Sequence, residues 1–326
     1  MKSCLNIIFA VTALLLAAPP LAHSQSVKAN AQARPIRIIV GTAAGGSIDT
    51  ISRGVAQRLG ERLDQNIIVE NRPGAGSLPA LETLTSAAPD GNTLMMLSGT
   101  TVIHPLLYPS RFNVARDITP ISLVSAQGYV LVIHPKIPAK SLPEFVQYLR
   151  SNTNTLNYAS SGIGSPIHMA GELFQLATGT RMTHIPFKGM SPAIADLVGG
   201  NVEVSCLTTI TSVPLVEAGR LRMLAVTTAK RVAALPEIPT FAEAGVPGVV
   251  VVNWYGLVAP VGVAKAAVDR IANETIRIMK SPALTARLAA DGSEAIGSTP
   301  AEFAALIRAD QAQWAKVIKQ AGIRGQ

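Results

Sequence analysis

Short apolar runs alternate with amphipathic stretches along most of the chain. Residues 36–40, 67–70 and 93–97 are β-branched or apolar runs typical of buried strands, while 48–63 and 79–87 repeat apolar residues at helical spacing. This strand–helix alternation predicts a parallel sheet with helices on both faces. Ligands of such sheets bind in loops beyond the carboxyl ends of the strands.

The pattern changes at 118–135, where two extended apolar stretches, 118–124 and 129–133, follow each other with no helix between them. A second α/β series then begins. In this series we predict helices at 142–151, 166–178, 191–198 and 213–218, and strands at 156–159, 182–185, 202–206 and 221–227. A Pro- and Gly-rich connector follows at 236–247, and extended segments follow at 249–252 and 254–259. The chain ends in predicted helices at 264–279, 282–290 and 300–321.

This organisation predicts two α/β lobes, with extended segments near 118–135 and 245–260 crossing between them. Lobe I comprises 34–128 plus 252–326, and lobe II comprises 129–251. Two crossings are typical of a hinge-bending binding protein whose ligand lies between the lobes. A single large doubly wound sheet is the alternative architecture.

Residues 1–24 resemble a secretory signal peptide, with Lys2 before an apolar core at 5–18 and small residues at 22–24. We therefore expect an exported protein cleaved near Ser24. Without that segment only Cys206 remains, so no intrachain disulfide can form.

The composition, with 48% hydrophobic and 15% charged residues among 326, indicates a globular chain with a substantial core. The net charge of +8 comes from scattered cations, and aromatic residues make up only 4%. This pattern argues against nucleic-acid binding and favours a modest positive field that collects small anions. We expect a monomer without cofactor or metal.

The stretch from Tyr158 to His168 is the first candidate for a ligand site. A strand leads into Ser160-Ser161-Gly162-Ile163-Gly164, and Ser165-Pro166 opens a helix as N-cap and first helical residue. A helix N-terminus attracts anions, so Ser161, Gly162, Gly164 and Ser165 form a candidate anion cradle. An ordinary strand–turn–helix joint is the alternative.

Three other loops follow strands in the same way. Gly45 and Gly46 could hold a carboxylate or phosphate on backbone amides, while Asp49 anchors the loop, contacts a ligand donor or simply favours the helix dipole. Thr100 follows a strand end at Ser98-Gly99, where an N-cap at Thr100 or Thr101 is the alternative. Lys188 could pair with an acidic ligand or remain solvated at its turn.

Catalysis finds little support in these motifs. The histidines lack metal-binding spacing, and paired carboxylates are absent from the loops. An exported hydrolase-like enzyme using Ser161 and His168 remains an alternative, but the serines precede the glycines and form no Gly-x-Ser-x-Gly elbow. We expect His168 to fix the loop by hydrogen bonding. A binding module fits better than an enzyme.

Several segments together resemble the Bug-type solute-binding proteins of tripartite tricarboxylate transporters. The resemblance extends from about Pro35 to Ile323. The matching segments are Gly45-Gly46-Ser47-Ile48-Asp49, Val69-Glu70-Asn71-Arg72-Pro73-Gly74-Ala75-Gly76, Ala88-Pro89-Asp90-Gly91-Asn92-Thr93-Leu94, Tyr158 to Ser165 with His168, Ile185-Pro186-Phe187-Lys188-Gly189, Asp196-Leu197-Val198-Gly199-Gly200, Leu224-Ala225-Val226-Thr227 and Pro239-Thr240-Phe241-Ala242-Glu243-Ala244-Gly245.

The resemblance implies a two-lobed periplasmic-binding-protein fold of type II-like topology that captures a small organic carboxylate and delivers it to membrane permease subunits. It implies ligand contacts from the Gly45-Gly46 loop with Asp49, from the loop around Ser161, and from His168 and Thr100. A receptor that presents its ligand to a signalling partner would use the same binding chemistry.

Two positions depart from the family pattern. Gly41-Thr42 replaces a proline and an aromatic residue, which removes a possible side-chain wall of the pocket. Ser77-Leu78 replaces a glycine–asparagine pair at the start of a helix.

Overall fold

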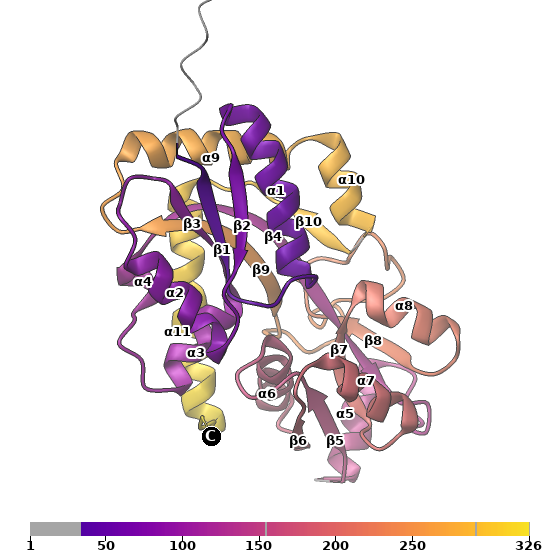
Figure 1. Ribbon diagram of the computed structural model, residues 1–326. Coiled ribbons are helices and arrows are strands. Elements are labelled where there is room, and N and C mark those ends of the chain that lie inside the picture. Colours follow the sequence, from indigo (N-terminus) through magenta and orange to yellow (C-terminus); the bar gives the residue numbers. More distant parts are fainter. Residues whose placement is uncertain (1–33, 154, 291, 326) are drawn as a thin grey trace, which may run out of the picture. The chain divides into compact units, whose positions relative to one another are not determined.

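The computed structural model describes residues 34–153, 155–290 and 292–325 (Figure 1). The predicted signal peptide, 1–24, lies outside the described residues. The elements in chain order are β1 (Ile36–Val40), α1 (Ser47–Leu63), β2 (Ile67–Asn71), η1 (Ala75–Ser77), α2 (Leu78–Thr85), β3 (Thr93–Ser98), α3 (Gly99–Leu107), α4 (Val114–Asp117), β4 (Ile118–Ile133), α5 (Leu142–Ser151), β5 (Asn157–Ser160), α6 (Pro166–Thr178), β6 (Thr183–Pro186), α7 (Met190–Gly199), β7 (Val204–Thr208), α8 (Thr209–Glu217), β8 (Arg222–Val226), β9 (Val252–Pro260), α9 (Lys265–Met279), α10 (Pro282–Ala290), β10 (Ser293–Ala295) and α11 (Pro300–Ala321).

The first three strands form a parallel group in which β1 pairs with β2 on one side and β3 on the other. Successive side chains of β1 point to opposite faces. Ile38 and Val40 pack in one apolar cluster with α1 and α9, while Ile39 packs in another with α2 and α11. The predicted sheet with helices on both faces is therefore confirmed, and α1 and α9 pack against each other (Figure 1).

Strand β4 connects this group to the remaining strands. Its residues 118–128 pair with β9, Tyr129–Ile133 pair with β7, and Val130–Ile133 also pair with β8, all antiparallel. Strand β5 runs parallel to β7 and β6. The strand order is thus β2-β1-β3-β9-β4-β7-β5-β6, with β8 and β10 also paired to β4.

The second strand group is also covered on two faces. Leu131 and Ile133 pack with α5 and α6, while Val130 and Val132 pack toward α7. The last helix, α11, contacts both α3 and α6, and its Trp314 and Val317 belong to the same cluster as Leu131. The C-terminal helix therefore stabilises the contact between α3 and the second strand group.

The two extended stretches predicted at 118–124 and 129–133 are confirmed, and they belong to one continuous strand, β4. Ser125 and Gln127 interrupt the apolar pattern, yet both are buried. Residues 125–127 pair with β9 and also with β10. Hydrogen bonding on both edges maintains the strand where polar side chains interrupt the apolar pattern.

The other predicted helices and strands are found within a few residues of their expected bounds, whereas α3, α4 and β10 were not predicted. Pro105 lies inside α3, and α4 and β10 are too short to show a period.

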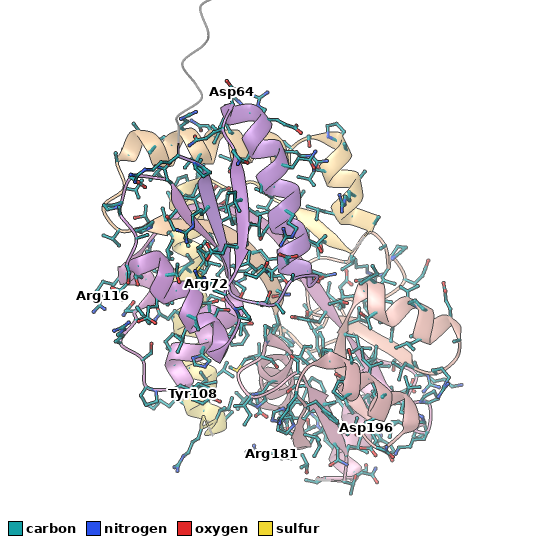
Figure 2. The ribbon with its side chains drawn as sticks, viewed as in Figure 1. Asp64, Arg72, Tyr108, Arg116, Arg181 and Asp196 are labelled. Carbon is teal, nitrogen blue, oxygen red and sulfur yellow. The ribbon has the colours of Figure 1, made fainter. Side chains whose placement is uncertain are left out.

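No described helix combines the length and apolar character needed to cross a membrane. Charged residues such as Arg116 and Arg181 are exposed and lie at the edge of the ribbon (Figure 2).

Candidate ligand-binding site

The loop between β1 and α1 is held by Asp49, which is only 3% exposed. Asp49 Oδ2 accepts hydrogen bonds from Gly45 N at 2.9 Å and Arg53 Nε at 3.0 Å, while Oδ1 accepts one from Asn71 Nδ2 at 2.9 Å. The same Asn71 amide donates to Thr42 O at 3.0 Å. Because protein donors engage both carboxylate oxygens, the geometry favours Asp49 as the anchor of the loop.

These bonds also determine the charge of Asp49. Hydrogen bonding from Arg53, joined by Gly45 N and Asn71, outweighs the opposing effect of burial and lowers the pKa of Asp49 to about 2. Asp49 is therefore ionised at neutral pH and paired with Arg53, so it adds little net charge to the loop.

The first turn of α1 keeps its backbone donors open. Its N-cap, Gly46, has no side chain to accept a hydrogen bond, and Gly45 has a φ of 89°. Within the described chain, the amides of Ser47, Ile48 and Asp49 have no acceptor. Such a turn attracts an anion by about 0.3–1 kcal/mol at an exposed position.

The first turn of α3, which follows β3, also lacks a side-chain cap. Helix α3 begins at Gly99 with Ser98 as its N-cap, so the predicted alternative of an N-cap at Thr100 or Thr101 is wrong. Ser98 Oγ lies 3.3 Å from Thr101 Oγ1 and caps no amide. Half-buried Thr100 thus lies in a first turn whose amides are not capped by a side chain.

The 161–165 loop is organised differently, because its own side chains use most of its donors. Ser165 is the predicted N-cap of α6, and its Oγ accepts from His168 N at 3.2 Å. Gly164 N donates to His168 Nδ1 at 3.1 Å, which confirms the expected loop-fixing role of His168. Since Pro166 has no N–H, Ile167 alone keeps an open amide in the first turn within the described chain. The cradle predicted here is therefore poorer in amides than the first turn of α1.

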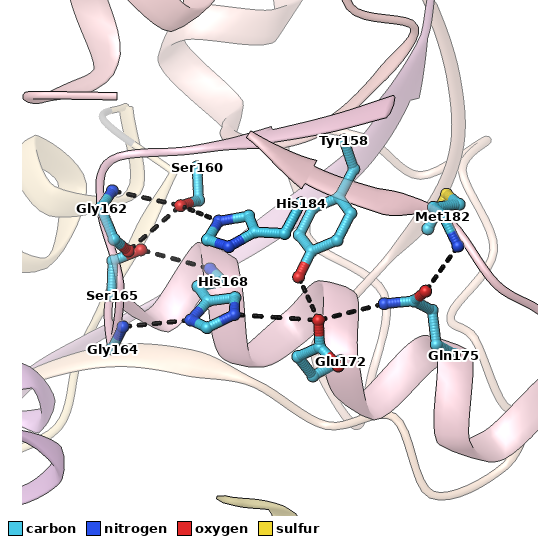
Figure 3. Close-up of polar contacts among 10 residues, drawn as sticks. All are labelled: Tyr158, Ser160, Gly162, Gly164, Ser165, His168, Glu172, Gln175, Met182 and His184. Atoms are coloured by element: carbon cyan, nitrogen blue, oxygen red, sulfur yellow. Dashed lines mark hydrogen bonds and ion pairs between the residues drawn. The ribbon is translucent and has the colours of Figure 1, made fainter. Parts of the chain in front are cut away.

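A buried polar cluster lies behind this loop (Figure 3). The rings of His168 and His184 stack with centroids 3.9 Å apart, and the Tyr158 ring stacks on His184 at 4.8 Å. Burial lowers the pKa of His168 to about 3, aided by neighbouring His184, and lowers that of His184 to about 4. Both imidazoles are neutral at physiological pH.

The cluster continues along α6 to Glu172. Glu172 Oε1 accepts from the Tyr158 hydroxyl and from Gln175 Nε2 at 3.2 Å, and it lies 3.7 Å from His168 Nε2. Sequence reasoning missed His184 and Glu172. The spacing of His168 and Glu172, four residues apart on one helix face, could have indicated their contact.

Helix α3 brings several candidate loops into one contiguous region. A Cβ added at Gly164 would lie 2.5 Å from Leu107 Cδ1 and 3.7 Å from Ile103 Cγ2, so the 161–165 loop lies directly on α3. Helix α3 also contacts η1, and η1 residue Ser77 donates to Gly41 O at 3.2 Å. Ser77, one of the departures from the family pattern, therefore supports the first glycine loop.

Lys188 lies beside the 161–165 loop. A Cβ added at Gly162 would lie 3.5 Å from Phe187 O, and Phe187 N donates to Ser160 O at 3.0 Å. The Lys188 side chain is exposed and has no ion-pair partner in the described chain. Its ammonium group is therefore available to an anion.

The geometry offers no nucleophile–base pair at Ser161 and His168. His168 Nδ1 accepts from the Gly164 amide, and Nε2 faces Glu172. Within the described residues, Ser161 makes no side-chain hydrogen bond, and no group of three or more His, Cys, Asp or Glu side chains could hold a metal ion.

The α/β topology, with loops at strand ends meeting on α3, has clear counterparts among periplasmic solute-binding proteins. A protein of R. palustris solved with adipate matches with a TM-score of 0.78 and 32% identity over 89% of this chain and 98% of that chain. MatC from Rhodopseudomonas palustris, with bound malate, matches with a TM-score of 0.74 and 30% identity over 87% and 99%. The fold is that of the periplasmic solute-binding proteins.

The family model of the tripartite tricarboxylate transporter family receptor matches residues 51–323, so the chain belongs to this receptor family. Among its curated relatives, BugT of Bordetella pertussis is 32% identical over 295 residues, which cover 90% of each chain. The Bug-type resemblance is thereby confirmed. Because the family and its solved structures are solute-binding receptors, the prediction that the chain is not an enzyme is also confirmed, and the hydrolase alternative is wrong.

Proposed function

We propose that this protein is a periplasmic receptor that captures a small organic carboxylate and delivers it to the membrane permease of a tripartite tricarboxylate-type transporter. The observation that carries the proposal is the pair of uncapped first turns in α1 and α3, which follow directly from β1 and β3. Similar structures contain adipate and malate, both dicarboxylates, which supports an acidic ligand here.

Each candidate residue has a distinct role in this proposal. The amides around Gly45 and Gly46 bind one carboxylate, with Asp49 holding their loop in place. Thr100 and Ser161 contribute hydroxyl groups. Gly162, Gly164, Ser165 and His168 shape the 161–165 loop, and Lys188 pairs with a second carboxylate. Bridging waters at these groups would let one site accept several acids at small cost.

Export by the 1–24 segment places the receptor in the periplasm in this proposal. The ligand then lies between lobe I (34–128 plus 252–326) and lobe II (129–251), which close about β4 and β9. Delivery is testable by co-purification: a tagged receptor expressed with its permease should retain the permease when its carboxylate is present. Retention of no membrane protein, with or without ligand, would contradict delivery to a permease.

A thermal-shift screen of the mature protein tests carboxylate binding. Adipate, malate and related diacids are compared with their diamides, which match them in size but carry no charge. A ligand at 100 times its Kd stabilises the folded state by about 2.7 kcal/mol, so a true ligand raises the Tm by several degrees. A shift with the diamides, and none with any acid, would overturn the proposal.

A further inference from the structure

His184 lies outside the 161–165 loop but contacts the residues that hold it. It comes from β6, and its half-buried ring lies between the rings of Tyr158 and His168 (Figure 3). Its Nε2 lies 2.7 Å from Ser160 Oγ. Ser160 is fully buried at the end of β5, immediately before the loop.

Ser160 connects His184 to the loop backbone. Ser160 Oγ accepts from Gly162 N at 3.1 Å and reaches Gly162 O at 3.1 Å. A hydroxyl has one proton, so when Ser160 donates to Gly162 O, His184 Nε2 must be the donor in the 2.7 Å contact. This direction satisfies all three contacts, and it requires the neutral Nε2–H tautomer of His184.

The stacked neighbour, His168, has the same tautomer. Its Nδ1 accepts from Gly164 N, so the ring proton of the neutral imidazole is on Nε2, which faces Glu172 Oε1 at 3.7 Å. The two rings therefore hold the two glycines of the loop, His168 directly at Gly164 and His184 through Ser160 at Gly162. Both glycines have positive φ, of 127° and 76°, a backbone conformation that glycine adopts readily.

We infer that His184 is a positioning residue of the carboxylate site: by donating from Nε2 to Ser160 it fixes the Gly162 peptide group and, through it, the 161–165 loop. This inference rests on the proposed function. It assigns no ligand contact to His184. Within the described chain, the amides of Ser161 and Ile163 are the loop donors left without a partner, and the Ile163 amide belongs to the same peptide group as Gly162 O, to which Ser160 donates.

Two substitutions separate the hydrogen bond of His184 from its stacking. His184→Phe keeps an aromatic ring between Tyr158 and His168 but cannot donate to Ser160. His184→Gln removes the ring and restores an N–H donor. Measured by calorimetric titration with the acid found in the screen, the Kd should rise about tenfold in His184→Phe, which corresponds to 1.4 kcal/mol, and stay within about threefold in His184→Gln.

Ser160→Ala and Ser205→Ala form a matched pair in case a His184 variant fails to fold. Both serines are buried in the same sheet, and Ser205 Oγ donates to Ala159 O at 3.0 Å without touching the loop. Each loses one buried hydroxyl, so similar losses of stability are expected. Only Ser160→Ala should raise the Kd about tenfold. Equal Kd values in the two variants would overturn the inference.

Histidine ¹⁵N NMR of the ligand-free protein provides a readout independent of binding. Neutral Nε2–H tautomers at His168 and His184 at pH 7 support the inference, and an Nδ1–H tautomer at His184 overturns it. If wild-type protein binds none of the acids, the proposed function fails, while the tautomers still report whether His184 holds Ser160.

Discussion

At the scale of single residues, Asp49 is assigned to the proposed carboxylate site as an anchor of the loop, not as a ligand contact. Its two oxygens hold Gly45, Asn71 and Arg53, and the Arg53 guanidinium compensates its negative charge. The ion pair is half exposed at Arg53 and buried at Asp49, which is a more favourable environment than that of an ordinary surface pair. The amides of α1 can therefore face a ligand without repulsion from Asp49.

Replacing Asp49 with Asn should destabilise the protein at neutral pH by about 1–2 kcal/mol, discounted for the exposure of Arg53. The lowered pKa of Asp49, about 2 against 3.8, means that its contribution is fully present above pH 3.8 and is lost as the pH falls through 2. Urea unfolding of both proteins at pH 7 and pH 2.5 checks this. A stability difference that does not shrink at pH 2.5 would contradict the assignment.

The residue chemistry could be predicted only where the partners are near in sequence. Ser165 and His168, three residues apart, were predicted as N-cap and loop-fixing residue, and both roles are confirmed. The His184–Ser160 contact joins two strands 24 residues apart. It depends on the register of β5 against β6, which a single sequence does not specify.

At the scale of elements, Thr227, which follows β8, connects the middle of β4 with Val251, the residue before β9. Thr227 Oγ1 accepts from Tyr129 N at 2.9 Å and donates to Val251 O at 2.5 Å. Its backbone N–H donates to Tyr129 O at 2.8 Å, and its carbonyl accepts from Val251 N at 2.9 Å. Thr227 is fully buried and so ties β4 to the start of β9 where both cross between the predicted lobes.

Thr227→Val keeps the shape of this side chain but leaves the Tyr129 amide and the Val251 carbonyl without their side-chain partner. We expect a loss of about 1–3 kcal/mol in the free energy of unfolding. Thr275→Val is the matched control, because Thr275 is equally buried and its hydroxyl bonds only to Ile271 O of its own helix. Similar losses of unfolding free energy in both variants, measured by denaturant unfolding, would show that the Thr227 hydroxyl does not specifically stabilise the contact between β4 and the start of β9.

Elements with strong local periodicity were predictable, and those defined by tertiary pairing were not. The pattern of α1 and α11 specified both helices, and the capping box of Thr299 and Glu302 marks the start of α11. The sequence indicated two extended stretches where the structure has one strand, β4, because polar Ser125 and Gln127 interrupt the apolar pattern. Pairing with β9 and β10 overrides that local pattern.

At the scale of the whole molecule, the division into two lobes predicts a movement that can be measured. A hollow of about 690 Å³ is lined by residues of both predicted lobes, including Ala233 and Ala289, and by β4 residues Ala126 and Gly128. None of the candidate ligand residues lines it. Closure about β4 and β9 should therefore change the separation of Ala233 and Ala289.

Spin labels on an Ala233→Cys/Ala289→Cys variant should show a distance distribution that shifts when the carboxylate is added. Native Cys206 is 4% exposed, and burial raises the pKa of its thiol to about 12, so it should resist labelling. A pair within predicted lobe II, Ala233→Cys/Ala242→Cys, should not shift. A constant 233–289 distance in protein that binds ligand would exclude closure.

The open first turns of α1 and α3, beside the 161–165 loop, are proposed to hold the ligand carboxylate. The most direct test is a crystal structure of the mature protein with the acid that gives the largest thermal shift. Carboxylate oxygens should lie about 2.7–3.2 Å from amides of the α1 first turn. A ligand bound in the hollow lined by Ala233 and Ala289, with the α1 turn facing only solvent, would contradict it.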